Sequence, residues 1–326
     1  MKKTILASAI AAATFSGAAM AQEINLPVVY GNIQYALTYT DAETKAGTSS
    51  HGLEHFDNGT TLGVAHDHEI APGITGFFKL EVDGFGADNK GAKKDIIKLD
   101  EAYVGVKGDN FGQVWVGSDD SMYETSVDEI GEFWEVGSGI GNDYDTGEGD
   151  LVQYLSPNFG GLKLGAAVQI NGDKDPLNGG KKSFPWQLAA MYNVDALELA
   201  FAVDSNDGAG NNENSYGLRA SFNLEDLRLT GQFETRKDVA DTFGVMGVYT
   251  LGANQFALGY QLVDEDSGDK EDVISLQALH NLSDHMYVYV EGYVSSADED
   301  KVYDVGNGAF TGDERSTIAL GAVYYF

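Results

Sequence analysis

The segment that decides the fold lies at residues 255–262 and reads Gln255-Phe256-Ala257-Leu258-Gly259-Tyr260-Gln261-Leu262. Its large apolar residues occupy every second position, and glutamine, alanine or glycine fill the positions between them. Because successive side chains of a β-strand point to opposite faces, this segment has one apolar face and one small or polar face. Residues 197–204 and 227–234 follow the same pattern. All three segments are therefore predicted to be strands with a single apolar face.

The whole chain is a succession of such runs. About 16 can be counted, at residues 28–40, 58–68, 74–83, 97–107, 112–118, 150–157, 161–170, 184–193, 197–204, 214–223, 227–235, 242–250, 255–263, 272–281, 286–295 and 315–326. Short connectors lie between them at residues 69–73, 108–111, 158–160, 194–196, 224–226, 251–254 and 282–285. Long polar connectors alternate with the short ones, at residues 41–57, 84–96, 119–149, 171–183, 205–213, 236–241, 264–271 and 296–314.

Short turns on one side of a sheet and long loops on the other are typical of bacterial outer-membrane barrels. A sheet in lipid must also close on itself, because an open edge would leave backbone polar groups without hydrogen bonds. We therefore predict an all-β fold, a 16-stranded antiparallel transmembrane β-barrel.

The first 21 residues have the layout of a secretory signal peptide. Lys2 and Lys3 precede a mostly apolar run, and Ala19-Met20-Ala21 matches a small-x-small cleavage site. We expect residues 1–21 to be removed before Gln22, which leaves residues 22–326 as a single transmembrane β-barrel domain. A retained membrane anchor is the alternative interpretation of the same segment.

The last run alternates up to the final residue, Phe326. An aromatic end of this kind resembles the C-terminal strand that the barrel insertion machinery recognises, so we expect that machinery to be a partner. Together with the signal peptide, it predicts export to the outer membrane of a Gram-negative bacterium. There the barrel would contact outer-membrane lipid and lipopolysaccharide.

The charge balance narrows the possible functions. The chain has 51 acidic and 20 basic residues, and removing Lys2 and Lys3 gives a net charge of −33. A chain this acidic repels nucleic acid, so no nucleic-acid partner is expected. The absence of cysteine excludes haem attachment, zinc–thiolate sites and cysteine nucleophiles, and no cofactor is predicted. The 33 tyrosines and phenylalanines argue against a disordered chain, because such chains are poor in aromatic residues.

Several motifs resemble the Gram-negative general (non-specific) outer-membrane porins. They are Tyr30-Gly31-Asn32, Ala102-Tyr103-Val104-Gly105-Val106-Lys107-Gly108-Asp109, Phe111-Gly112-Gln113-Val114-Trp115-Val116-Gly117, Ser156-Pro157-Asn158-Phe159-Gly160-Gly161 and Tyr325-Phe326. The resemblance implies a homotrimer of 16-stranded barrels, each a water-filled channel for passive diffusion of ions and small hydrophilic solutes. It also implies that the third outer loop folds inward as a constriction loop, which here corresponds to residues 119–149.

One feature departs from this family. Its constriction loop typically faces a cluster of wall arginines, whereas this chain has only four arginines in all, Arg219, Arg228, Arg236 and Arg315. The strand after the loop, where relatives often carry arginine, reads Val152-Gln153-Tyr154. The strong transverse field of the general porins is therefore not predicted here.

Residues 118–150 contain eleven carboxylates and no lysine or arginine. If the loop folds inward, some of them face a narrow aqueous passage, where low-dielectric walls concentrate cations and exclude anions. The alternative is an acidic loop that is merely solvated. We expect Glu124, Asp128, Glu129 and Glu132 to face the passage most directly, and the candidate constriction residues are Asp119, Asp120, Glu124, Asp128, Glu129, Glu132 and Glu135.

The alternation also assigns the charged residues of the wall. A lysine or arginine facing lipid at mid-depth costs about 2–4 kcal/mol, so charges within strands are expected to face the lumen. The predicted wall residues are Lys79, Glu81, Asp83, Glu101, Lys163, Glu198, Arg219, Arg228 and Glu234. The predicted lipid-facing residues include Leu164, Leu199, Leu229, Phe256, Leu258 and Leu320.

Functions other than a diffusion channel find less support in the sequence. A sugar-preferring channel would place aromatic residues inward, and Tyr103, Trp115, Tyr287 and Tyr289 are candidates. A barrel enzyme finds little support, because no G-x-S-x-G motif occurs. An adhesive barrel would need a plugged lumen, and no metal site is predicted, because the pair His66 and His68 has no evident third ligand.

Overall fold

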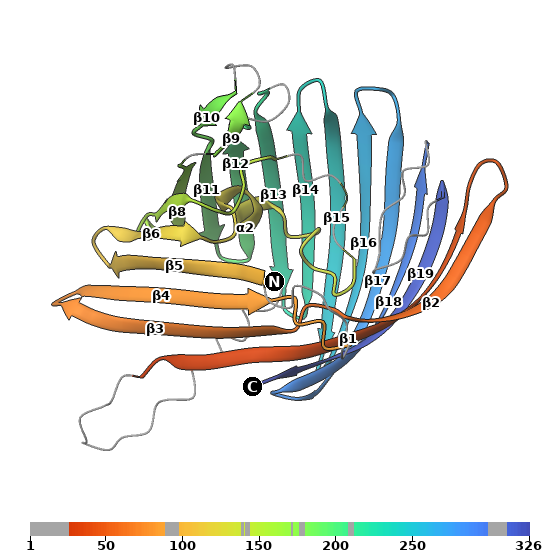
Figure 1. Ribbon diagram of the computed structural model, residues 1–326, viewed down its shortest axis with the longest axis horizontal. Coiled ribbons are helices and arrows are strands. Elements are labelled where there is room, and N and C mark those ends of the chain that lie inside the picture. Colours follow the sequence, from red (N-terminus) through yellow and green to blue (C-terminus); the bar gives the residue numbers. More distant parts are fainter. Residues whose placement is uncertain are drawn as a thin grey trace.

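A computed structural model describes residues 26–88, 98–137, 140, 144–170, 172–175 (backbone only), 180–207, 212–298 and 312–326. These residues form one ring of antiparallel strands (Figure 1). The predicted signal peptide, residues 1–21, lies outside them. Within the described ranges, no helix is long and apolar enough to cross a membrane.

The strands of the ring follow one another along the chain, and each pairs with its neighbours. Their bounds are β1 (Val28–Glu43), β2 (Ser49–Asp57), β3 (Thr61–Ala71), β4 (Ile74–Asp83), β5 (Lys98–Gly108), β6 (Gly112–Ser118), β7 (Leu151–Leu155), β8 (Leu162–Gln169), β11 (Trp186–Val194), β12 (Leu197–Asp204), β13 (Ser215–Leu224), β14 (Leu227–Arg236), β15 (Ala240–Leu251), β16 (Asn254–Glu265), β17 (Lys270–Ser283), β18 (Met286–Ala297) and β19 (Glu314–Tyr325).

The first strand closes the ring. β1 pairs with β19 from Asn32 to Glu43, and its other edge pairs first with β3 and then with β2. β2 and β3 thus occupy one strand position, interrupted at residues 58–60, and the barrel has 16 strand positions. The predicted closed, 16-stranded antiparallel barrel is confirmed.

Two long connectors contain strands that the sequence analysis did not predict. Residues 41–57 are mostly strand, since β1 runs to Glu43 and β2 begins at Ser49. This hairpin carries polar residues on both faces, so the apolar alternation that marks the other strands is missing. The connector at 171–183 contains a small separate ladder of β9 (Gly172–Asp175) and β10 (Lys181–Ser183).

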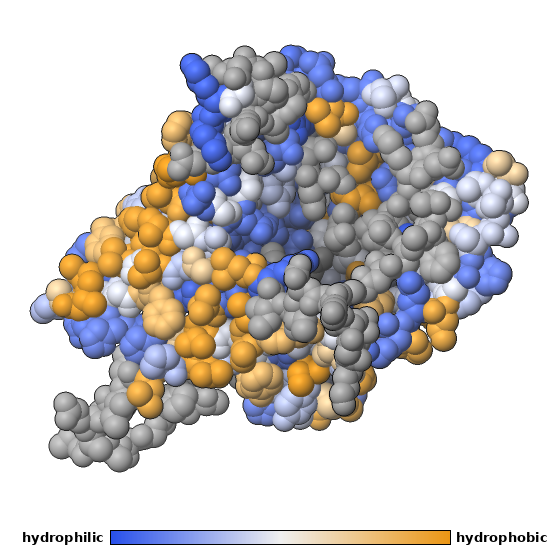
Figure 2. Space-filling model, in the orientation of Figure 1, coloured by the Kyte–Doolittle hydropathy of each residue, from blue (hydrophilic) through white to orange (hydrophobic). Residues whose placement is uncertain are grey.

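The predicted register is correct. All six residues predicted to face lipid are 40–56% exposed, whereas their chain neighbours Ala200, Ala257 and Ala319 are buried. Because the side-chain period of a strand is two residues, a shift of one residue would have reversed this result. Figure 2 shows hydrophobic side chains over β3 to β6 on the outside and hydrophilic side chains around the central hollow.

Candidate channel constriction

The loop between β6 and β7, described at residues 119–137, 140 and 144–150, turns into the barrel and contains a short helix near its start, α2 (Met122–Val127). Ser121 caps the helix, because its hydroxyl accepts the backbone N–H of Glu124 at 3.1 Å. The helix lies within the ring of strands (Figure 1) and packs against β11, β12 and β13. The loop therefore folds inward, as predicted.

Inward-facing glycines make room for the loop. A Cβ atom at Gly217 would lie 2.7 Å from the Tyr123 hydroxyl, and one at Gly259 would lie 2.6 Å from Cζ2 of Trp134. Tyr123 and Trp134 are almost fully buried as a result. The glycines that alternate with apolar residues in the sequence thus shape a seat for the loop along the wall.

The charged clamp of the loop is Glu129, held by Arg219 and Arg228 on the adjacent wall. Arg228 donates from Nε to Oε1 and from Nη2 to Oε2 of Glu129, both at 2.7 Å, and Arg219 forms a further ion pair. Thr230 donates to the same carboxylate at 2.7 Å. Burial alone would raise the pKa of Glu129, but these partners, Arg228 first, lower it to about 2.

Arg219 and Arg228 also lie close to a carboxylate of the barrel wall itself, that of Glu198. Arg228 donates from Nη1 to the Glu198 carboxylate at 2.8 Å, and Arg219 lies 3.7 Å from it. Two glutamates thus compensate two arginines within one cluster. Half of the arginines in the chain therefore contribute no formal excess charge to the lumen.

A second anchor holds the tip of the loop. Glu291 of β18 accepts the backbone N–H groups of Glu135 and Val136 at 2.8 and 3.0 Å. It also accepts the Tyr293 hydroxyl at 2.5 Å and the Gln277 amide at 2.8 Å. The sequence analysis missed Glu291, although it alternates with inward tyrosines in the run at 286–295 and so already lay on the lumen face.

Two of the four residues expected to face the passage most directly are buried instead. The Glu124 carboxylate accepts the Tyr144 hydroxyl at 2.9 Å, and Asp128 accepts the backbone N–H of Gly131 at 3.1 Å. Glu129 is held in the clamp described above. Glu132 is half-buried. The expectation was wrong for Glu124 and Asp128 because polar groups of the loop itself and of the wall take up their carboxylates.

Several loop carboxylates have raised pKa values. Burial, together with the charge of Glu132, raises the pKa of Glu124 to about 8. Burial and the charge of Glu124 raise that of Asp120 to about 8. Burial also raises the pKa of Asp119 to about 6, although this carboxylate accepts the indole N–H of Trp115 at 2.6 Å. These groups repel one another as anions, so they ionise one after another rather than together.

On the wall formed by β4 and β5, the amine of Lys79 lies among carboxylates. Lys79 Nζ lies 2.5 Å from Oε2 of Glu101 and 3.6 Å from Oε2 of Glu81. The Tyr30 hydroxyl donates to Glu81 at 2.6 Å. Gln153, on the strand where relatives often carry arginine, is buried and donates to the backbone carbonyl of Asp120 at 3.1 Å.

The remaining predicted wall residues lie apart from these clusters. Glu234 is buried and accepts the hydroxyl of Tyr123 at 3.0 Å. Lys163 is exposed near the turn before β8, and Asp83 is half-buried at the last residue of β4. The tip carboxylate, Glu135, accepts the Tyr287 hydroxyl at 3.0 Å.

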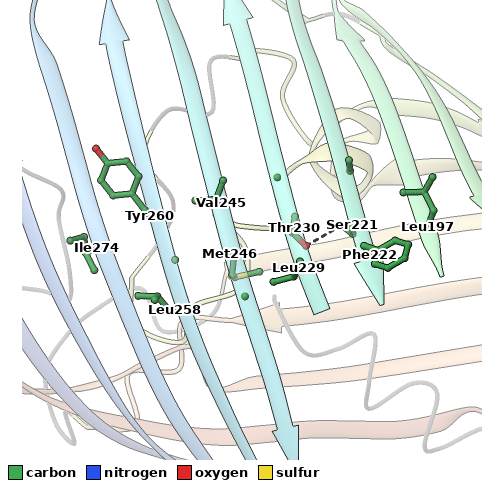
Figure 3. Close-up of a pocket in the computed structure, with 14 residues that line it drawn as sticks. Leu197, Ser221, Phe222, Leu229, Thr230, Val245, Met246, Leu258, Tyr260 and Ile274 are labelled. Carbon is green, nitrogen blue, oxygen red and sulfur yellow. Dashed lines mark hydrogen bonds between the residues drawn. The ribbon is translucent and has the colours of Figure 1, made fainter. Parts of the chain in front are cut away.

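Two further features are not part of the lumen. His66 and His68 stack on the outward face of β3, with ring centroids 6.0 Å apart, and no group of three potential metal ligands occurs within the described ranges. An apolar groove on the outer face of β13 to β16, lined by Phe222, Leu229 and Leu258, faces away from the lumen (Figure 3). Its lining is mostly apolar, although Tyr260 also contributes to it.

Residues 7–300 match the Gram-negative porin family. The "Monosaccharide porin" of a Halomonas species and the "Major outer membrane protein" of Halomonas elongata are each 32% identical to this chain, with full coverage of both chains. Among solved structures, an anion-selective porin from Comamonas acidovorans superposes with a TM-score of 0.75. It is 18% identical and covers 92% of this chain and 99% of its own.

Proposed function

The chain belongs to the Gram-negative porin family of non-enzymatic outer-membrane channels, and from that premise we propose that its channel is water-filled and selects cations. Ions and small hydrophilic solutes cross it by passive diffusion. The observation that carries the proposed selectivity is how the basic side chains around the loop are paired. Arg219 and Arg228 are compensated by Glu129 and Glu198, and Lys79 is outnumbered by Glu81 and Glu101.

The carboxylates outside these ion pairs make the electrostatic potential of the lumen negative. Asp119, Glu132 and Glu148 belong to a loop that contains no lysine or arginine. Their field acts across a passage bounded by low-dielectric walls, which concentrates cations at its narrowest part. Cations therefore meet an attractive potential and anions a repulsive one.

The test is a reversal potential in a planar lipid bilayer under a potassium chloride gradient. We expect preference for potassium near 0.1 M salt that weakens toward 1 M, because the Debye length falls from about 10 Å to about 3 Å. The Comamonas neighbour is named as an anion-selective porin, but at 18% identity it informs the fold alone. A reversal potential of the anion-selective sign would overturn the proposal.

A second candidate is a channel with a preference for monosaccharides. The relative called a monosaccharide porin is 32% identical over its full length. Inward tyrosines and carboxylates could hydrogen-bond sugar hydroxyls, although Tyr287 and Tyr289 are buried against neighbours. Liposome swelling with glucose and with a polyol of similar size separates the two candidates, since equal rates mean simple diffusion.

Assembly and export complete the proposal. We infer a homotrimer and removal of residues 1–21, with Phe326 presented to the barrel insertion machinery and the outer surface in contact with lipid and lipopolysaccharide. Crosslinking and analytical ultracentrifugation in mild detergent test the trimer, and a monomer would refute it. N-terminal sequencing of protein from the outer membrane tests the cleavage, which we expect before Gln22.

A further inference from the structure

The wall opposite the clamp contains an arrangement that should be unstable without its lysine. Glu81 and Glu101 are direct cross-strand partners of β4 and β5. Like charges placed directly opposite each other in an antiparallel pair destabilise the sheet. Both carboxylates are buried, so water screens their repulsion weakly.

Lys79 relieves this repulsion. Its amine contacts Glu101 at 2.5 Å and lies 3.6 Å from Glu81, while its side chain remains only 15% exposed. The ring of Tyr30 lies 6.0 Å from the amine, and its hydroxyl bonds to Glu81. The charge of Asp119, at the start of the loop, acts on the same amine.

The chemistry of this cluster suggests what would replace the amine if it were absent. Oxygen atoms of two glutamates on adjacent strands are the ligands that magnesium and calcium ions prefer. A covalently attached ammonium group in the same place compensates the carboxylates but cannot be exchanged with the medium. The arrangement therefore determines how divalent cations interact with the wall.

We propose that Lys79 is a specificity-determining residue: a tethered counter-ion that occupies the Glu81–Glu101 pair and so prevents divalent cations from binding there and blocking the channel. Monovalent cations then pass an acidic wall that holds no tightly bound ion. The inference rests on the proposed cation channel, but it concerns the response to magnesium and calcium rather than the sign of the selectivity.

The experiment measures single-channel potassium current in 0.1 M potassium chloride while magnesium or calcium chloride is added. In Lys79→Gln, which keeps a hydrogen-bond donor for Glu101 but loses the charge, the half-blocking concentration should fall about tenfold or more, equivalent to about 1.4 kcal/mol of binding free energy. Lys79→Arg keeps the charge and should behave as the wild type. Lys45→Gln is the matched control, because it removes an exposed lysine in the turn between β1 and β2.

A second variant keeps the test decisive. Adding Glu101→Gln to Lys79→Gln removes one ligand and should abolish the new block. If Lys79→Gln folds only when magnesium is supplied, the ion has replaced the amine and the inference is supported. A folded Lys79→Gln channel with the wild-type half-blocking concentration overturns it. The reversal potential of the wild type in potassium chloride alone tests the proposed function separately, so the two failures are distinguishable.

Discussion

Replacing Glu129 with glutamine should release the constriction loop from the wall. The amide keeps the shape of the side chain but leaves Arg219 and Arg228 with Glu198 as their remaining carboxylate among the contacts of this cluster. The loop would then be held by its apolar seat, by Glu291 and by the ion pair between Asp145 of the loop and Arg236 of β14. The docked loop should consequently lose stability relative to a displaced one.

The size of the effect follows from the burial of the partners. Removing one member of a buried ion pair costs about 3–5 kcal/mol, because the other charge is left uncompensated. Glu129, Arg219 and Arg228 are 14–26% exposed, so partial hydration reduces this to about 2–3 kcal/mol. The population of displaced loop should then rise by a factor of about 30 to 150.

The absence of cysteine provides a clean assay. Ser126→Cys places one thiol in α2, where the native side chain is buried, and its rate of modification by a maleimide reports the displaced population. Glu129→Gln should raise that rate by the factor given above. Glu148→Gln, which removes an exposed carboxylate from the same loop, should leave it unchanged. Equal rates in the parent and in Glu129→Gln would show that the clamp does not hold the loop.

Two further predictions concern the passage. Raising the pH from 6 to 9 should increase the preference for potassium, because Asp120 and Glu124 become charged as the pH rises through their pKa values of about 8. A reversal potential that does not change with pH would contradict this prediction. Gly259→Ala should displace the loop and change the single-channel conductance, because the added methyl group would lie 2.6 Å from Trp134. Gly231→Ala, where the methyl group meets nothing within 4 Å, should not, and equal conductances in both variants would contradict the packing.

The strands and their register could be predicted because lipid imposes a rule on every second residue. Leu229 and Leu258 had to face outward, and their neighbours inward, wherever the chain crosses the apolar layer. The alternation of apolar and polar residues is not required where both faces of a strand contact water. Residues 41–57 lack the alternation for this reason, so the end of β1 and the whole of β2 were predicted to be a loop.

The contacts of the constriction loop could be predicted only in part. Its inward course followed from the family resemblance, and its acidity from composition. Which carboxylate meets which wall residue depends on side chains far apart in sequence, such as Glu129 and Arg228, 99 residues apart. The alternation of residues along a strand or loop does not reveal such a long-range pairing. Glu124 and Asp128 were therefore expected to face the passage, although they are buried.

The loop carboxylates therefore divide into two groups with different physical roles. Glu129 forms ion pairs with Arg219 and Arg228 of the wall that the loop contacts. Its pKa of about 2 keeps it ionised at any physiological pH. Asp120 and Glu124, with pKa values of about 8, are largely neutral at pH 7. The proposed selectivity thus rests on fewer charges than the eleven carboxylates of residues 118–150 imply. Because Arg219 and Arg228 lie beside the loop and Gln153 is neutral, we expect no strong transverse field, so the sign of a solute's net charge should govern its passage.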